Sequence, residues 1–267
     1  MKRKLLGLCL AICMALNLIT FITVPTVSAA LPTSSEVPNY SRELKTLGNK
    51  VVYADTEEPI VLRGVNIPSL GWGMAEHLAE SIVEMYDGWN SNLIRLAVNP
   101  NFWFNGSVDA GKNLTKEKYR QWIDDMVKAA QVRGKYIIID CHTYVCPVQE
   151  TMDFWMDMCD VYGNNPAVLF GLLNEPHSID WELWRNGGTK NDAPAIGHQA
   201  LVEAIRDKGI KNILIAAGLN WGYNLSGIVD GYALIDQGSG NDLSKAGNGI
   251  IYDSHVYPGK SGKNRDG

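Results

Sequence analysis

The feature that most constrains the fold of this chain is a repeated alternation between short apolar runs and longer amphipathic segments. The apolar runs contain almost no interior polar residues, which is typical of strands that are buried on both faces. They cover residues 91–98, 135–140, 167–173, 211–218 and 249–257. A strand–helix–strand order with such strands predicts a parallel sheet with helical crossovers, and a chain of 267 residues can form it as a single domain.

The segments between the strands carry helical periodicity. In residues 114–134, apolar side chains recur at helical spacing from Tyr119 to Ala130, and Gly134 follows as a helix-ending residue. Residues 149–163 and 196–209 are predicted to form helices as well. Near the amino end, two β-branched runs flank the polar sequence DTEE, which predicts a hairpin leading into the first core strand at residues 59–67.

Two architectures fit this order, a doubly wound sheet and a (β/α)8 barrel, and the residues at the strand ends discriminate between them. Several strands deliver a charged, imidazole or amide group there, and no G-x-G-x-x-G motif follows any strand. In barrels, catalytic groups from several strands collect at the carboxyl-terminal face, so the pattern favours the barrel. The residues are Arg95, His142, Asn174, Glu175, His255 and Tyr257.

Five short motifs, each near its strand end, together resemble glycoside hydrolase family 5, and most closely its bacterial cellulases. They are RGVNI, IRL, IIIDCH, LLNEP and DSHVY, and the resemblance covers about residues 40 to 260. It implies a (β/α)8 barrel that hydrolyses a β-1,4-linked polysaccharide by a retaining double displacement. No cofactor is implied.

The resemblance also implies roles for single residues. Glu175 matches the general acid/base, and Asn174 the residue that binds the sugar 2-hydroxyl. Arg95 matches the arginine that orients the nucleophile. The remaining matches, to positions that hydrogen-bond the sugar and its neighbouring catalytic groups, are His142, His255 and Tyr257. From the sequence pattern by itself, Asn174 could instead cap a short helical turn.

Tryptophans divide into two predicted groups. Trp122 and Trp155 fall inside helical stripes and are expected in the core. Trp72 and Trp221 lie after strands and are predicted to stack against sugar rings. The same loop position makes three others weaker candidates for stacking: Trp103, Trp181 and Trp184. The histidines that match no family position, His77, His177 and His198, are expected at the surface or in packing contacts.

Composition excludes several classes of partner and site. A net charge of −5 leaves no basic footprint for nucleic acid. Cys141 precedes His142, but the spacings that zinc favours are missing, so no metal site is predicted. We expect Cys141, Cys146 and Cys159 to be buried thiols, with one local disulfide as the alternative.

The amino terminus has the layout of a secretory signal peptide, with a basic start, an apolar stretch and small residues before a cleavage point after Ala29. An uncleaved membrane anchor is the alternative. Cleavage would leave residues 30–267 as an exported catalytic domain, with no stable membrane insertion. We therefore predict a secreted, extracellular protein.

The carboxyl terminus leads to a prediction about completeness. The family's nucleophile is a glutamate on strand seven of the barrel, whereas the sixth predicted strand ends near Tyr257. We expect six strand–helix units here, so that strands seven and eight and the nucleophile are missing from this chain. The protein could carry further modules beyond Gly267. The fragment is then expected to be inactive. The alternatives are a glycan-binding protein on the same scaffold, or a β-mannanase or xyloglucanase of the same family.

Overall fold

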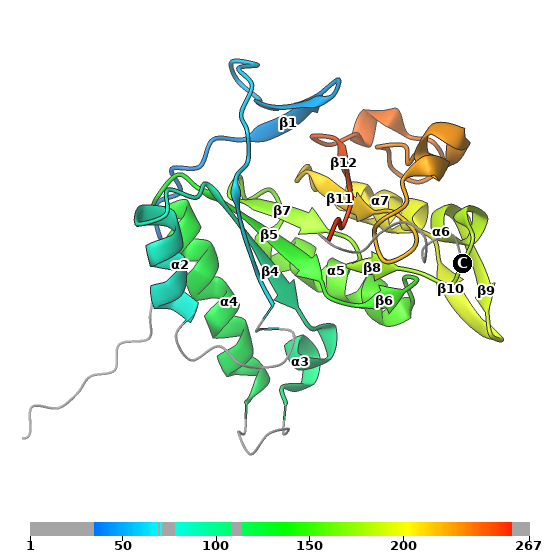
Figure 1. The fold of residues 1–267 in the computed structure, drawn as a ribbon, viewed down its shortest axis with the longest axis horizontal. Coiled ribbons are helices and arrows are strands. Elements are labelled where there is room, and N and C mark those ends of the chain that lie inside the picture. The colour runs from blue at the N-terminus through cyan, green and yellow to red at the C-terminus, as the bar shows by residue number, and fades with distance from the viewer. Residues whose placement is uncertain (1–34, 69, 71–77, 108–113, 258–267) are drawn as a thin grey trace, which may run out of the picture. The chain divides into compact units, whose positions relative to one another are not determined.

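The computed structural model describes residues 35–68, 70, 78–107 and 114–257 (Figure 1). The predicted signal peptide at residues 1–29 and the candidate Trp72 lie outside the described residues. Among the residues that the structure describes, no helix is both long enough and apolar enough to cross a membrane.

A six-stranded parallel sheet forms the framework of the chain. Its strands occur in the order in which they follow one another in the sequence, from one edge to the other. A doubly wound sheet reverses its strand order at a switch point, whereas a barrel sheet advances in one direction. The order therefore identifies the barrel type of winding. The strands are β3 (Gly64–Ile67), β4 (Leu93–Val98), β5 (Tyr136–Cys141), β7 (Val168–Gly171), β11 (Leu214–Ala217) and β12 (Ile250–Asp253).

The two faces of the sheet differ because successive side chains of a strand point in opposite directions. In β5, Ile137 and Ile139 pack into the larger core cluster beneath the helices, whereas Tyr136 and Ile138 belong to a smaller cluster on the other face. Leu169 of β7 and Ile215 of β11 continue this second cluster. Both faces are thus apolar, which explains why the strands read as continuous apolar runs.

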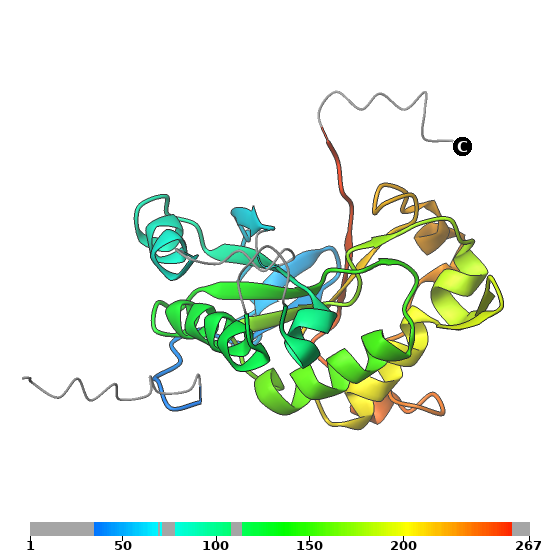
Figure 2. The same ribbon diagram turned by 90° about the horizontal axis from the view of Figure 1, so that it is seen from below.

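Helices cover one face of the sheet (Figure 2). The helix predicted from residue 114 runs over Lys116–Gln131 (α4), and the hydroxyl of Thr115 caps it by accepting from the backbone N–H of Lys118 at 3.2 Å. The other crossover helices are α2 (Leu78–Asp87), α5 (Gln149–Tyr162) and α7 (His198–Asp207). Trp155 of α5 is fully buried in the core, as predicted. Trp122 of α4 is partly buried and packs against the same core.

The amino-terminal hairpin differs from its prediction. β2 (Lys50–Tyr53) pairs with β1 (Leu44–Leu47), a strand that the sequence analysis did not identify. The segment after DTEE contributes only a single bridge, between Val52 and Pro59, before the core strand begins at Gly64. Leu44 packs into the smaller core cluster, so the hairpin covers part of the face that the helices leave open.

Several short elements connect the core strands and the crossover helices, and none was predicted. β6 (Tyr144–Val145) pairs with β8 (Glu175–Pro176), and β9 (Gly187–Lys190) with β10 (Ala193–Ile196). The short helices are α3 (Pro100–Asn105), α6 (Trp181–Asn186), η3 (Ile228–Tyr232) and η4 (Leu243–Lys245). All three cysteines expected after signal cleavage are buried and free, which decides against the local disulfide.

Candidate active site

Polar side chains from four strands meet at the carboxyl edge of the sheet. Arg95 comes from the middle of β4, His142 directly follows β5, and His255 follows β12. Glu175 forms the short strand β8 after β7. Because all core strands are parallel, their carboxyl ends lie at one edge, and the groups predicted from separate motifs come together.

A buried ion pair fixes the first part of this cluster. The guanidinium of Arg95 donates to Asn174 Oδ1 at 2.7 Å and to Asn66 Oδ1 at 2.8 Å, and lies 2.9 Å from Asp140 Oδ1. The Asp140 side chain is only 2% exposed. A buried charge is tolerated only where it is paired, so Asp140 holds the arginine in place and the arginine orients Asn174. This contact also shows that Asn174 belongs to the cluster and does not cap a helix.

Asp140 also orients His142. Its second oxygen lies 2.8 Å from His142 Nδ1, which must donate because a carboxylate only accepts. His142 Nε2 is then left to accept a hydrogen bond from the hydroxyl of Tyr144, 3.4 Å away. Burial raises the pKa of Tyr144, and the nearby Glu175 and Asp140 raise it further, so this hydroxyl stays protonated. One carboxylate thus positions two predicted site residues.

The carboxylate of Glu175 is held from the opposite side of the site. Its Oε1 lies 2.9 Å from His255 Nδ1 and accepts from the hydroxyl of Tyr257 at 3.4 Å. The Glu175 side chain is 16% exposed, so part of it remains open to solvent. Burial and the neighbouring Glu175 both raise the pKa of Tyr257, which keeps the phenol as a donor to that carboxylate.

His255 has a second carboxylate partner. Its Nε2 lies 3.2 Å from Asp253 Oδ2, at the end of β12. Burial lowers the pKa of His255, but the hydrogen bonds to Asp253 and Glu175 outweigh burial, and the pKa is raised overall. The two acids on either side of the imidazole therefore stabilise its protonated form.

Four residues of this cluster were missed by the sequence analysis: Asn66, Asp140, Tyr144 and Asp253. A usable signal was present for two of them. Asp140 and Asp253 each follow the apolar run of a strand, in IIID and IIYD, two residues before a predicted site histidine. An acidic residue at that position is as informative as the histidine two residues later, since both reach the same edge of the sheet.

Trp221 is the one tryptophan of the predicted stacking group whose ring the structure shows largely open, with 53% of its surface exposed. One face of the indole stacks on His177, with 4.5 Å between ring centroids and 13° between planes. The backbone N–H of Trp221 donates to the Pro176 carbonyl at 3.0 Å, which ties the loop to the segment carrying Glu175. The loop that carries Trp221 is therefore bound to the residue that directly follows Glu175.

The weaker tryptophan predictions were wrong for two residues. Trp103 lies in α3 and Trp184 in α6, and both are buried, at 1% and 0% exposure. Trp181, also in α6, packs edge-on against Trp184 and stacks with Tyr232. The short helices turn these side chains inward, whereas the sequence analysis placed them in loops.

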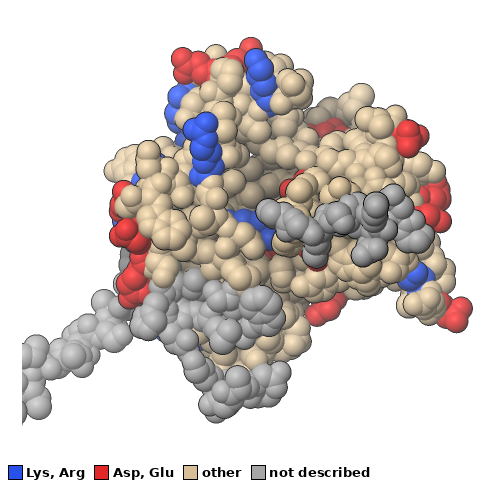
Figure 3. Space-filling view, in the orientation of Figure 1, with Lys and Arg blue, Asp and Glu red and all other residues tan. Residues whose placement is uncertain are grey.

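A cavity of about 750 Å³ lies along the helix-free face of the sheet, between the β1–β2 hairpin and the strands. Its apolar wall includes Ile138, Leu169 and Ile215, and its polar lining includes Arg95 and Asp253. The space-filling view shows a hollow between the hairpin and the carboxyl-terminal elements, with Lys and Arg on the hairpin (Figure 3). This volume is within the range of small-molecule sites.

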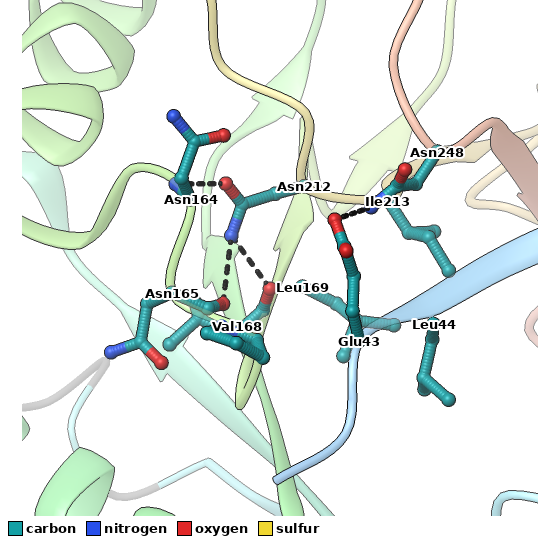
Figure 4. Close-up of a pocket in the computed structure, with 10 residues that line it drawn as sticks. Glu43, Leu44, Asn164, Asn165, Val168, Leu169, Asn212, Ile213 and Asn248 are labelled. Carbon is teal, nitrogen blue, oxygen red and sulfur yellow. Dashed lines mark hydrogen bonds between the residues drawn. The ribbon is translucent and has the colours of Figure 1, made fainter. Parts of the chain in front are cut away.

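A second, much smaller cavity of about 20 Å³ lies at the amino ends of the strands (Figure 4). Its polar groups bond to one another: Asn212 donates to the carbonyls of Val168 at 2.8 Å and Asn165 at 3.2 Å. Asn248 donates to Glu43 at 2.8 Å. A space of this size holds about one water molecule, so it is a structural feature and no substrate site.

Comparisons with known proteins agree with this geometry. Residues 53–266 match the family model described as cellulase (glycosyl hydrolase family 5). The chain is 29% identical over 226 residues to endoglucanase A of Butyrivibrio fibrisolvens, covering 82% of this chain and 46% of the relative. An endoglucanase of Clostridium saccharobutylicum is 25% identical over 258 residues, covering 93% of this chain and 49% of the relative. The chain thus spans about half the length of these relatives.

Among solved structures, a β-glucanase from Saccharophagus degradans in complex with cellotetraose is similar in fold. The TM-score is 0.62 and the identity 24%, over 88% of this chain and 68% of that one. This likeness supports a (β/α)8 barrel fold, of which the six-stranded parallel sheet forms a part.

Proposed function

This chain belongs to glycosyl hydrolase family 5, and on that premise we propose that its protein is an endo-acting β-1,4-glycanase of the cellulase type. The observation that carries the proposal is the placement of Glu175, held by His255 and Tyr257 at the carboxyl edge of the sheet beside Asn174. The substrate is a β-1,4-linked polysaccharide, in keeping with the endoglucanases that the chain resembles.

In this proposal Glu175 is the general acid/base. It protonates the glycosidic oxygen as the bond breaks, and then removes a proton from the attacking water. Asn174 binds the sugar: Arg95 occupies its Oδ1, which leaves the amide N–H groups to donate to the 2-hydroxyl. Hydrogen bonds that involve the 2-hydroxyl become stronger in the oxocarbenium-like transition state.

The mechanism that we propose is a retaining double displacement, which needs a second carboxylate as nucleophile. We assign that role to neither Asp140 nor Asp253. Asp140 is buried and bound to both Arg95 and His142, and Asp253 is engaged by His255. The nucleophile is therefore a further carboxylate outside this hydrogen-bonded network. Secretion, based on the amino-terminal sequence, completes the proposal, because a polymeric β-glucan is degraded outside the cell.

Substitution of Glu175 by glutamine in the whole protein tests the proposal. The amide has nearly the same shape but carries no transferable proton, so hydrolysis of β-1,4-glucan should fall by at least about 10²-fold. Glu182→Gln, an exposed glutamate of α6, is the matched control and should keep full activity. Reducing-sugar release is the readout. Normal activity of the Glu175 variant would refute the assignment, and glycan binding without cleavage by the unmodified protein would indicate a binding protein.

A further inference from the structure

His255 lies between the carboxylates of Glu175, the proposed general acid/base, and Asp253. Nδ1 is 2.9 Å from Oε1 of Glu175, and Nε2 is 3.2 Å from Oδ2 of Asp253. A neutral imidazole has one donor nitrogen and one acceptor nitrogen, whereas a carboxylate only accepts. An ionised Asp253 therefore requires the proton on Nε2, which leaves Nδ1 to exchange a proton with Glu175.

We propose that Asp253 is a positioning residue: it holds a proton on Nε2 of His255, so that Nδ1 and the carboxyl of Glu175 share a single further proton. This rests on the proposed function, because Glu175 must act as acid and then as base. In one arrangement His255 is protonated and Glu175 ionised, and in the other His255 is neutral and Glu175 carries the proton. Both arrangements contain two protons, and the summed charge of Asp253, His255 and Glu175 is the same in both.

The surroundings of His255 support this arrangement. The charged groups that act on it are Glu175, Asp253 and Arg95, and Tyr257 donates to the same carboxylate oxygen of Glu175. Arg95 and burial disfavour the protonated imidazole, whereas the two carboxylates favour it and prevail. Burial raises the pKa of Asp253, but the hydrogen bond from His255 and the positive charges of His255 and Arg95 together lower it overall, which favours an ionised Asp253.

The sheet itself fixes the backbone of Asp253. Asp253 is the last residue of β12, in register with Ala217 of β11, and its carbonyl accepts from the N–H of Gly218 at 3.2 Å. The backbone N–H of His255 donates to the Gly222 carbonyl at 2.9 Å. Both ends of the Asp253–His255 contact are thus anchored to neighbouring backbone.

The proton balance then follows the reaction. When the glycosidic bond breaks, the shared proton moves from Glu175 to the leaving oxygen, and the nucleophile forms its bond to the sugar. When water attacks the intermediate, its proton returns to Glu175. Throughout, Asp253 remains ionised and Nε2 of His255 remains protonated, so Asp253 neither gains nor loses a proton.

Asp253→Asn in the whole enzyme tests this role. An amide can donate to Nε2 and so reverse the tautomer, which fixes a proton on Nδ1 and holds Glu175 ionised. Turnover of β-glucan should fall at least about tenfold, since general acid catalysis is impaired. A dinitrophenyl β-cellobioside needs no protonation of its leaving group, and its cleavage should change far less. Asp230→Asn, at an exposed aspartate of η3, is the matched control and should behave as the unmodified enzyme.

Imidazole nitrogen-15 NMR gives a readout that needs no activity and no variant. In the unmodified protein, the Nε2 signal of His255 should be that of a protonated nitrogen. An unprotonated Nε2, or equal loss of activity on both substrates in Asp253→Asn, would overturn the proposal. Full β-glucan activity of Asp253→Asn beside an inactive Glu175→Gln would refute the role of Asp253 and leave the proposed function standing. An active Glu175→Gln would instead refute the proposed function.

Discussion

Gly222 packs directly against the imidazole of His255. A Cβ atom added to this glycine would lie 2.8 Å from His255 Cγ, closer than side-chain carbons approach in real structures, and the glycine has a φ of +77°. The loop after β11 therefore forms one wall behind the histidine that contacts Glu175. Only a residue without a side chain allows this approach.

Gly222→Ala is accordingly expected to displace His255 and to reduce turnover. A shift of about 1 Å in a catalytic constellation can cost on the order of 10²-fold in rate. Gly240→Ala is a matched control, because Gly240 has a similar φ of +71° but open space around its missing side chain. Both variants should lose about 1–2 kcal/mol of stability from the left-handed backbone. Only Gly222→Ala should also lose kcat, and equal activity of the two variants would contradict the packing argument.

Removal of the Trp221 indole should weaken substrate binding more than it slows turnover. An exposed aromatic face contributes on the order of 1 kcal/mol to a stacking contact, so Trp221→Ala should raise KM for a soluble β-glucan about five- to tenfold. Trp89, also exposed, at 62%, lies outside the site, and Trp89→Ala should leave KM unchanged. A drop in kcat with unchanged KM would show that Trp221 does not act as a sugar platform.

The products of the first turnover should keep the anomeric configuration of the substrate. A retaining mechanism places the two carboxyl groups roughly 5 to 5.5 Å apart, which leaves no room for water between them. Proton NMR of the first sugar released by the whole enzyme distinguishes the two outcomes. An inverted product would rule out the double displacement and require a carboxylate at a greater distance from Glu175.

Acid should destabilise the fold through His198. This histidine is fully buried, and its Nδ1 lies 2.8 Å from the Trp184 carbonyl. Within the part of the chain that the structure describes, its Nε2 has no hydrogen-bond partner. Burial lowers its pKa to about 4. Because the folded-state pKa lies below the unfolded value of about 6.5, stability is full above pH 6.5 and is lost as pH falls toward 4, by up to about 3 kcal/mol.

Chemical unfolding between pH 7 and pH 4 measures this effect. His198→Gln keeps a donor for the Trp184 carbonyl but has no imidazole to protonate, so its stability should fall less steeply with acid than that of the unmodified protein. His177→Gln, at a partly exposed histidine, controls for the substitution and should keep the original steepness. Identical pH dependence in the two variants would exclude His198 as the source.

Local sequence patterns predict the periodic elements and the edge of the sheet that carries the polar residues. Strands buried on both faces require continuous apolar runs, and the motif residues at their ends must gather where parallel strands end. For that reason Arg95, His142, Asn174, Glu175, His255 and Tyr257 could be named before the structure, although their roles stay predictions.

Tertiary structure decided the rest, because the deciding contacts join residues far apart in the chain. The unreversed strand order selected the barrel over the doubly wound sheet. Packing of α3 and α6 buried Trp103 and Trp184, which look like loop residues in the sequence. The partners that orient the site, Asp140 for Arg95 and Asp253 for His255, became visible only as distances between side chains. Local patterns specify which face of an element is apolar, whereas the pairing of charges across strands depends on register and on which strands become neighbours.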